Sequence, residues 1–327
     1  MTQNMTAFVV NKVDSEFSAN VVSVPIPKVG EGESLIRVLW SSINYKDGLA
    51  SIEEGKVIRS YPRILGIDIA GVVVDSSGTG PQTDSYVFAN GYELGVNRDG
   101  GFAQYCSVPS NWLIEINSDL EAQKVMTAGT AGFTAAQSAL QILEKVPVDR
   151  GPVLVTGATG GVGSFAVALL SNCGYEVVAS TGRADRSDWL KSLGATRVMG
   201  RLPESVKPLE KESWAAVVDT VGGMTLQSAL ASTKYSGIVT TCGNTGGSTL
   251  STSVFPFILR SITLIGIDSV NVEMHAKTQI WKWLLTQLPS SEWQKLTGKI
   301  AEFETLPESL SEVLAGQTRG RTLVQIG

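Results

Sequence analysis

The sequence predicts an α/β protein in which a doubly wound parallel sheet follows a β-rich segment. Up to about residue 120, short apolar runs such as FVV, SLIRVLW and IAGVVV are separated by Gly, Pro, Asp and Asn, which is typical of strands and turns. From residue 121 onward, apolar strands alternate with helical patterns, which is typical of a parallel sheet with crossover helices. A glycine-dense turn, TGATGGVG, lies between the first of these strands and a helix.

In chain order, we expect six strands in this second segment, at PVLVT, EVVAST, RVMG, WAAVVDTVG, SGIVTTCG and SITLIGIDS. We expect helices at MTAGTAGFTAAQSALQIL, VGSFAVALL, DRSDWLKSLGA and MTLQSALAS. A Trp-rich helical run, QIWKWLLTQL, then leads to short strand-like pieces that end in GRTLVQIG. We expect this tail to return to the first segment, so that the domains are 1–122, 123–270 and 271–327.

Composition and charge narrow the class of protein. The chain has 327 residues, 43% of them apolar, and a net charge of −5, which argues against the basic face of a nucleic-acid-binding protein. No apolar stretch approaches a membrane-spanning length, and no secretory signal is expected at the N-terminus. The three cysteines, Cys106, Cys173 and Cys242, are far apart and favour reduced thiols in a cytoplasmic protein. The single histidine, His275, lies near the start of a helix and is given no catalytic role.

The glycine turn predicts a dinucleotide site. Gly157, Gly160 and Gly163 depart from the commonest G-x-G-x-x-G spacing, but they follow a strand and open a helix. Glycines let a diphosphate approach the backbone, and the start of the helix offers N–H groups to the anion. We therefore expect phosphate contacts within the segment Thr159, Gly160, Gly161 and Val162. The alternative is a tight turn that is only structural.

The end of the next strand indicates which dinucleotide binds. An NAD site typically places Asp or Glu there, to bond the ribose hydroxyls. This chain instead has Ser180, Thr181, Gly182 and Arg183. Hydroxyls and a guanidinium suit a phosphate dianion, so NADP(H) is the expected cofactor. Arg201, after the following strand, is expected on the other side of the phosphate; Lys191 is a weaker candidate, and a solvated Arg183 is the alternative.

Five longer boxes carry a resemblance to a known family: TGATGGVGSFAVALL, GTAGFTA, SINYKDGLA, YPRILGIDIAG and FPFILRSITLIGIDSV. Together they resemble the zinc-free quinone-oxidoreductase side of the medium-chain dehydrogenase/reductase superfamily, and more narrowly its acryloyl-CoA reductase branch. The resemblance runs over nearly the whole chain. It implies a GroES-like β-barrel domain, closed by the C-terminal segment, beside a Rossmann domain. It also implies a homodimer in which the edge strands of two Rossmann sheets pair.

The same resemblance implies a site without zinc. Zinc-dependent relatives take ligands from a Cys in one strand region and from the His of a Gly-His-Glu box. The equivalent stretches here are Asn44-Tyr45-Lys46-Asp47 and Gly66-Ile67-Asp68, and neither holds Cys or His. Because a catalytic zinc needs about three N, S or O ligands from the protein, we expect no metal here.

Residue roles follow from the resemblance. NADPH would deliver hydride to the β-carbon of an α,β-unsaturated carbonyl, and the resulting enolate needs hydrogen-bond donors and a proton. Asn44 and Tyr45 are the expected catalytic residues, and Tyr45 is also expected to touch the nicotinamide. Asp47 is expected to anchor the loop through backbone N–H groups, and Lys46 to point away from Tyr45 if this piece is extended. Further cofactor contacts are expected from Thr130, Asn244, Ile267, Asp268, Ser269 and Gln317.

Three functions remain open from the sequence. The first is an NADPH-dependent reductase of acryloyl-CoA, and the second is a quinone or enone reductase of broad range. The third is an NADPH-binding protein without activity, which the intact Asn44–Asp47 loop argues against. One departure affects the choice of substrate, because Gly91-Tyr92 replaces a Trp-Gly pattern of the family in a loop that borders its substrate site.

Overall fold

The computed structural model describes residues 3–204 and 207–327, and the chain divides into two compact units. The first unit comprises Met1–Thr130, Ser269–Gln279 and Thr297–Gly327. The second comprises Ala131–Asp268 and Ile280–Leu296. Within the described ranges, no helix is both long and apolar enough to cross a bilayer.

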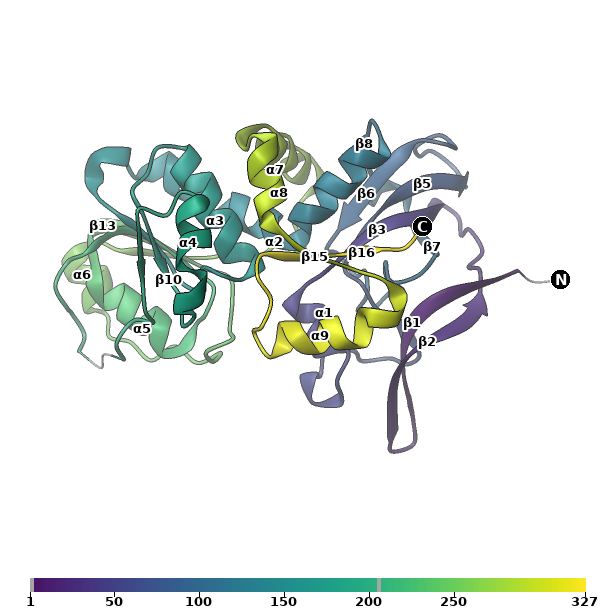
Figure 1. Ribbon diagram of the computed structural model, residues 1–327, viewed down its shortest axis with the longest axis horizontal. Coiled ribbons are helices and arrows are strands. Elements are labelled where there is room, and N and C mark those ends of the chain that lie inside the picture. Colours follow the sequence, from purple (N-terminus) through teal and green to yellow (C-terminus); the bar gives the residue numbers. More distant parts are fainter. Residues whose placement is uncertain (1–2, 205–206) are drawn as a thin grey trace. The chain divides into compact units, whose positions relative to one another are not determined.

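A six-stranded parallel sheet forms the centre of the second unit (Figure 1). Its strand order is β11-β10-β9-β12-β13-β14, so the order reverses between β9 and β12, where open α/β sheets bind ligands. Every residue of β9, β10 and β12 is buried, as expected for parallel strands covered by helices on both faces. The six strands expected from the sequence are confirmed: β9 (Val153–Val155), β10 (Val177–Ser180), β11 (Arg197–Met199), β12 (Trp214–Asp219), β13 (Thr233–Thr241) and β14 (Thr263–Gly266).

Helices connect these strands. The first crossover helix, α3, follows the glycine turn, and its apolar residues from Phe165 to Leu170 are buried. The other helices between these strands are shorter, and α6 starts with a proline in its first turn, where the missing N–H costs no helical bond. The helices assigned wholly to this unit are α3 (Gly161–Asn172), α4 (Ser187–Ser192), α5 (Gly223–Ser232), α6 (Phe255–Arg260) and α8 (Ser290–Leu296).

The first unit is β-rich and contains two sheets. A three-stranded sheet has the order β2-β1-β4, and a seven-stranded sheet has the order β15-β16-β3-β5-β6-β8, with β7 paired to β3. The N-terminal strands are β1 (Asn4–Val13), β2 (Glu16–Pro25), β3 (Glu33–Ile43), β4 (Arg63–Ile64), β5 (Asp68–Ser76), β6 (Tyr86–Asn90), β7 (Tyr105–Pro109) and β8 (Ile114–Ile116). The strands from the C-terminus are β15 (Thr297–Ala301) and β16 (Arg321–Gln325).

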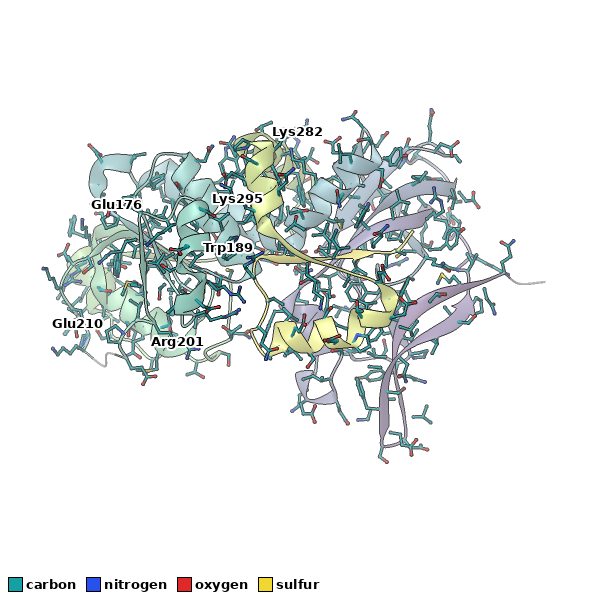
Figure 2. All side chains as sticks on the ribbon, in the orientation of Figure 1. Glu176, Trp189, Arg201, Glu210, Lys282 and Lys295 are labelled. Carbon is teal, nitrogen blue, oxygen red and sulfur yellow. The ribbon has the colours of Figure 1, made fainter. Side chains whose placement is uncertain are left out.

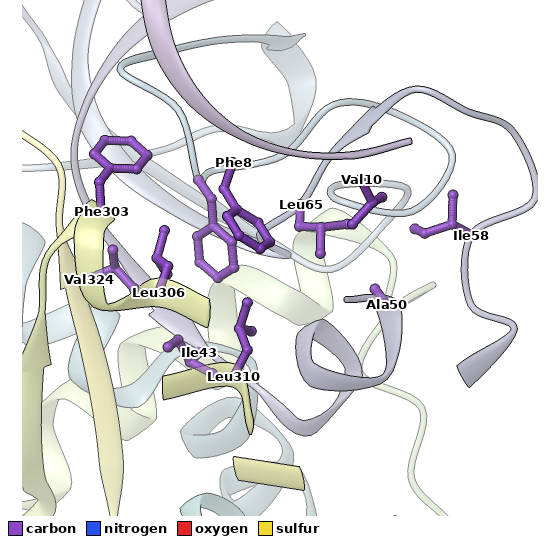
Figure 3. Close-up of a cluster of buried hydrophobic side chains, with 11 residues drawn as sticks. Phe8, Val10, Ile43, Ala50, Ile58, Leu65, Phe303, Leu306, Leu310 and Val324 are labelled. Carbon is purple, nitrogen blue, oxygen red and sulfur yellow. The ribbon is translucent and has the colours of Figure 1, made fainter. Parts of the chain in front are cut away.

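The C-terminal strands complete this unit. Figure 1 shows β16 beside β3, and the two pair antiparallel with Thr322 opposite Ile43. Helix α9 (Leu306–Leu314) lies against α1 (Tyr45–Ala50), where a side chain on Gly48 would meet Val313 and Leu314. A buried apolar cluster joins both ends of the chain, as Figure 3 shows for Phe8, Val10, Ile43, Ala50, Ile58, Leu65, Phe303, Leu306, Leu310 and Val324.

The sequence predicted that the whole segment 271–327 returns to the first unit, but only part of it does. Helix α7 (Met274–Gln287) begins in the first unit, but Ile280–Leu296 belongs to the second. Aromatic packing explains this assignment, since Trp281 stacks on Phe133 with 5.7 Å between ring centroids and Trp293 packs edge-on against Phe165. Helix α2 (Asp119–Lys145) also passes from one unit to the other, and the second unit starts within it at Ala131, eight residues beyond the expected start at 123.

Candidate active and cofactor sites

The glycine turn between β9 and α3 is as tight as its sequence suggests. Gly157 has φ +57°, and a Cβ there would lie 2.3 Å from Oγ1 of Thr220. A Cβ on Gly163 would lie 2.4 Å from the carbonyl oxygen of Gly157. Both glycines are therefore required by the protein's own packing, which lets the start of α3 lie close to the end of β9.

Gly160 differs from its two neighbours in the motif. Its φ is −77°, which any residue adopts, and the nearest atom to an added Cβ would be the Gly157 carbonyl oxygen at 3.4 Å. The protein's own packing therefore does not require glycine at this position. Helix α3 begins directly afterwards, at Gly161, where the first backbone N–H groups have no acceptor within the helix. Free N–H groups at a helix start, without a close protein contact at Gly160, fit a diphosphate.

The end of β10 holds the residues expected to select the cofactor. Thr181 is buried, its Oγ1 accepts from the backbone N–H of Arg183 at 3.1 Å, and it lies 3.4 Å from Oγ1 of Thr159. Ser180 is also buried, and its hydroxyl donates to the carbonyl of Gly200 at 3.0 Å. The Ser180 proton is therefore used to hold β10 against the residues after β11.

One arginine side chain, that of Arg201, lies beside Gly182, and the next residue of the chain is a second arginine. The guanidinium of Arg201 (labelled in Figure 2) passes so close to the Gly182 backbone that an added Cβ would lie 2.7 Å from its Nε. Arg183 follows Gly182 directly, and its side chain is half-buried. Burial, followed by the nearby Arg186, lowers the pKa of the Arg183 guanidinium. The charge of Asp185 acts in the opposite direction and raises it. A guanidinium pairs well with a phosphate dianion.

The sequence analysis did not identify Asp219, an acid that bonds the end of β9 and the loop after β12. Asp219, at the end of β12, is fully buried, and its carboxylate accepts from Oγ1 of Thr156 at 2.8 Å and from the backbone N–H of Gly222 at 2.9 Å. Burial raises the pKa of this carboxyl. An acid at the end of an apolar run, WAAVVD, is the signal that could have identified it.

Three more expected cofactor residues lie in the second unit. Asn244 is exposed after β13, and its carbonyl accepts from Gly247 at 3.0 Å. Ile267 continues the line of β14, with its N–H donating to Thr241 at 3.0 Å. The carbonyl of Asp268 accepts from Nε2 of Gln137 at 2.9 Å. All three follow the carboxyl ends of strands, where ligands of such sheets bind.

The predicted active-site loop lies in the first unit and is helical. Tyr45–Ala50 form α1, with Asn44 as its extended N-cap. The argument that Lys46 points away from Tyr45 assumed an extended chain, and that assumption is wrong, because Asp47 stabilises a helix start here. Oδ2 of Asp47 accepts from the N–H of Asn44 at 2.8 Å, and Oδ1 accepts from the N–H of Ile67 at 3.0 Å. The anchoring role expected of Asp47 is confirmed.

Asp68 links this loop to α2 and is fully buried. Its Oδ2 accepts from Nδ2 of Asn44 at 2.7 Å and from the hydroxyl of Ser42 at 2.6 Å. Its Oδ1 accepts from the hydroxyl of Thr130 at 2.6 Å, and the N–H of Thr130 lies 3.0 Å from Oδ2. Asn44 also donates to the carbonyl of Ser42 at 3.3 Å, so both hydrogens of its amide have acceptors within the protein.

Arg321 and Gly129 complete this buried cluster. Arg321 is 3% exposed and donates to the hydroxyl of Ser42 at 2.8 Å, with its guanidinium 3.8 Å from Asp68. Gly129 interrupts α2 with φ +52°, and a Cβ there would lie 2.4 Å from both Oδ2 of Asp68 and Oγ of Ser42. The second half of α2 therefore starts at Thr130, with a carboxylate at its N-terminus, where negative charge is favoured.

Burial and charge set the protonation of the second acid in the cluster. Burial, followed by the charge of Asp68, raises the pKa of Asp47 to about 7, and the two backbone N–H bonds lower it in part. Burial lowers the pKa of Arg321, and the charges of Asp68 and Asp47 raise it. A protonated Asp47 leaves one buried pair, Asp68 with Arg321, and no net buried charge.

Three expected residues of the first unit lie outside this cluster. The side chain of Tyr45 is half-buried, and its hydroxyl has no hydrogen-bond partner within residues 3–204 and 207–327. Gln317 is exposed after α9, with its N–H donating to Glu312 at 2.9 Å. Ser269 comes close to the loop after β6, since a Cβ on Gly91 would lie 2.8 Å from its carbonyl oxygen.

The positions of the lost zinc ligands are occupied by bonded or apolar groups. Asn44 has a side chain engaged with Asp68, and Ile67 is an apolar residue, 3% exposed. Among the described residues, no cluster of three or more His, Cys, Asp or Glu side chains has the arrangement of a metal site.

The two units are those of a two-domain dehydrogenase. Residues 30–118 match the alcohol dehydrogenase GroES-like domain, and residues 161–286 match the domain described as zinc-binding dehydrogenase. The chain belongs to the medium-chain dehydrogenase/reductase superfamily, in its zinc-independent, quinone-oxidoreductase-like branch.

Two relatives are similar to this chain over their full length. The chain is 41% identical to the probable acrylyl-CoA reductase AcuI of Escherichia coli, with 98% of this chain and 100% of the relative covered. It is 40% identical to the putative quinone oxidoreductase YhfP of Bacillus subtilis over the whole of both chains. A crystal structure of YhfP contains NAD; it covers 99% of this chain and 100% of YhfP, with a TM-score of 0.94. The crystal structure of E. coli YhdH with NADPH has a TM-score of 0.94, with 40% identity and 98% and 100% coverage.

Proposed function

We propose that this protein uses NADPH to reduce the carbon–carbon double bond of acryloyl-CoA, giving propionyl-CoA. The full-length similarity to a probable acrylyl-CoA reductase is the observation that carries this proposal. The substituted ligand positions, Asn44 and Ile67, support it, because these side chains do not build a zinc site for polarising an alcohol or a carbonyl.

NADPH would supply the hydride, and the chain's own residues would hold it. The amides of Gly161 and Val162, next to Gly160, where an added Cβ would make no close contact, suit the diphosphate. Thr181, Arg183 and Arg201 suit the 2′-phosphate, because a guanidinium pairs with phosphate through two hydrogen bonds. The chain has no acid within Ser180–Arg183 that would favour the free ribose hydroxyls of NAD.

In the substrate, hydride addition leaves an enolate on the thioester, which needs a donor at its oxygen and a proton at its α-carbon. The Tyr45 hydroxyl is the better candidate donor of the two expected catalytic residues, because both amide hydrogens of Asn44 already have acceptors. Asn44 would then hold the loop in place through Asp68. Thr130, bonded to the same carboxylate, would contact the nicotinamide end of the cofactor.

A quinone or enone reductase is the second candidate, because the chain is equally similar to YhfP. Measuring kcat/KM with NADPH for acryloyl-CoA, a simple quinone and a small enone separates the two. We expect acryloyl-CoA to be preferred, and prolonged treatment with a chelator to leave that rate unchanged. A wide preference for the quinone would overturn the acryloyl-CoA assignment. Loss of rate on chelation, restored by zinc, would overturn the metal-free mechanism.

We also propose a cytoplasmic homodimer. Helix α6 exposes an apolar surface next to the edge strand β14, with Val254 62%, Ile258 67% and Leu259 56% exposed. Pairing of two such edges would cover this surface. Sedimentation should show a dimer that Ile258→Asp dissociates, whereas a wild-type monomer would contradict the proposal. The three unpaired cysteines favour a reducing compartment.

A further inference from the structure

The three-stranded sheet β2-β1-β4 has apolar side chains on both of its faces. Side chains alternate along β1, so Phe8 and Val10 lie in the buried cluster that joins the two ends of the chain, whereas Met5 lies on the opposite face. Val9 and Val24 pack against that opposite face and are only half-buried. The buried residues of this second, smaller cluster are Met5, Ala7, Ile64 and Ala103. The chain therefore builds an apolar wall that it covers only in part.

A cavity of about 540 Å³ is lined by this wall, and its volume is within the usual range of small-molecule sites. The lining residues come mostly from β1, β2, β4, β7 and the loops beside them, and all of them belong to the first unit. Met5, Val24 and Ile64 supply apolar surface, and five charged side chains line the cavity as well. An apolar wall with a few polar groups is the usual construction of a ligand site.

The charged side chains of this lining favour an anion. Arg98 forms an ion pair with Glu33. Arg63 forms a second ion pair with Asp99, at 3.0 Å. The third cation, Lys28, is exposed and has no hydrogen-bond or ion-pair partner among the described residues. Three cations and two carboxylates leave one positive charge at the cavity, although the chain as a whole carries a net charge of −5.

The unused hydrogen-bonding groups of the two arginines are all donors. Arg98 bonds Glu33 through Nη2, and its Nη1 has no acceptor within residues 3–204 and 207–327. The Nε atoms of Arg63 and Arg98 are buried, and neither has an acceptor in the same part of the chain. A guanidinium has five donor hydrogens and no acceptor, so only an acceptor can satisfy it. A carboxylate offers two acceptor oxygens in the geometry that a guanidinium prefers.

We propose that this cavity binds a small organic anion, in which a carboxylate held by Lys28 and Arg98 is joined to an apolar body that lies on Met5, Val24 and Ile64. A cation would be repelled by the net positive charge of the lining, and a neutral apolar molecule would leave the free donors without an acceptor. The proposed site shares no residue with the loop Asn44–Asp47 or with the expected cofactor contacts, so it does not rest on the proposed function.

Calorimetric titration of the whole protein with hexanoate tests the proposal, with saturating NADPH present so that the cofactor site is filled. We expect a dissociation constant on the order of 0.1–1 mM, as is usual for a ligand of so few atoms. Hexanamide has nearly the same apolar body without the charge, and inorganic phosphate has the charge without the body. Both should bind at least about tenfold more weakly than hexanoate, because each lacks one of the two contacts.

Three variants assign the binding to this cavity. Lys28→Glu should weaken hexanoate binding by about threefold to tenfold, because it replaces an attraction at an exposed position with a repulsion. Val24→Trp should abolish the binding, because the indole fills the cavity without changing its charge. Lys282→Glu, at an exposed residue of α7 in the second unit (labelled in Figure 2), is the control and should keep the wild-type affinity. If Val24→Trp does not fold, Lys28→Glu still decides, because Lys28 has no partner to lose.

Equal affinity for hexanoate and hexanamide would overturn the proposal, and so would hexanoate binding that Lys28→Glu leaves unchanged. Phosphate bound as tightly as hexanoate would overturn it as well, because the apolar wall would then contribute nothing. The same holds if hexanoate does not bind at concentrations well above the expected dissociation constant. Failure of the proposed function would leave these results unaffected, because none of the titrations depends on which substrate the protein reduces.

Discussion

The guanidinium of Arg201 lies against the backbone of Gly182, so closely that a Cβ on Gly182 would meet its Nε at 2.7 Å. Arg183 is the next residue of the chain, 18 positions before Arg201. We propose that these two residues underlie the expected preference for NADPH, because a guanidinium pairs well with a phosphate dianion.

We expect Arg183→Ala to weaken NADPH binding at least tenfold and to leave NADH binding nearly unchanged. A charge-assisted contact typically contributes about 1.5–3 kcal/mol, and about 1.4 kcal/mol corresponds to tenfold in affinity. Arg201→Ala should act in the same direction. Titration of both cofactors by fluorescence gives the dissociation constants, with Arg197→Ala, at an exposed position of β11, as control. Equal wild-type affinity for NADPH and NADH would contradict this reading of the site.

Alanine substitutions at two glycines of the turn between β9 and α3 should affect different properties, one cofactor binding and the other stability. Gly160→Ala should weaken NADPH binding by about tenfold or more and hardly change the melting temperature, because its Cβ meets no protein atom closer than 3.4 Å. Gly163→Ala should lower stability by about 1–3 kcal/mol, because its Cβ would lie 2.4 Å from the Gly157 carbonyl.

Melting curves and NADPH titrations on both variants make the comparison. If Gly160→Ala binds NADPH as the wild type does, the diphosphate does not lie over Gly160. If Gly163→Ala keeps the wild-type melting temperature, the backbone can relax around the new methyl group, and the packing argument is wrong.

The Rossmann unit could be predicted from the sequence because its signals are local. Each of its six strands is an apolar run, and the turn at Gly157–Gly163 lies between a strand and a helix within one continuous segment. The extended reading of Asn44–Asp47 was wrong because a side chain decides it: Asp47 accepts the N–H of Asn44 and starts a helix. A capping acid three residues after Asn was a signal available in the sequence.

The Asp68 cluster could not be predicted in this way. Arg321 lies 253 residues after Asp68, and only the antiparallel pairing of β16 with β3 brings it there. The partners of Thr130 also depend on the positive φ of Gly129 inside what the sequence presents as one helix. Division of the tail between the units likewise depends on contacts such as Trp281 with Phe133.

Tyr45→Phe should lower kcat for acryloyl-CoA by at least about tenfold, since a donor to a developing oxyanion contributes on the order of 10²–10³ in rate. The Tyr45 hydroxyl has no partner elsewhere in the described chain, so phenylalanine leaves the surrounding bonds intact. Steady-state kinetics give kcat and KM, and Tyr235→Phe, at a ring that is 59% exposed, is the control. A nearly unchanged kcat would mean that Tyr45 only packs on the nicotinamide, and the donor would then be a backbone N–H or a rearranged Asn44.

The pKa of Asp47 predicts a pH dependence of stability. Its carboxyl is buried beside Asp68 and Arg321, and its pKa is raised to about 7, whereas an unfolded Asp ionises near pH 3.9. Between these values the folded chain keeps a proton that the unfolded chain has released. The free energy of unfolding should therefore fall as the pH rises from about 4 to about 7, by on the order of 1 kcal/mol per pH unit from this group, and the dependence should end above pH 7.

Asp47→Asn tests this assignment, because asparagine does not titrate. Its absolute stability should be lower, since the NH₂ group of an amide cannot accept one of the two backbone N–H groups that the two oxygens of the Asp47 carboxyl group accept. The informative quantity is the difference between wild type and variant, measured by denaturant unfolding at half-unit steps from pH 4 to 8. That difference should be largest near pH 4 and shrink toward pH 7, while the same comparison with Asp75→Asn, an exposed acid, should stay flat. A wild-type advantage that instead grows with pH would mean that Arg321 holds Asp47 ionised and that this charge outweighs the effect of burial on the pKa of Asp47.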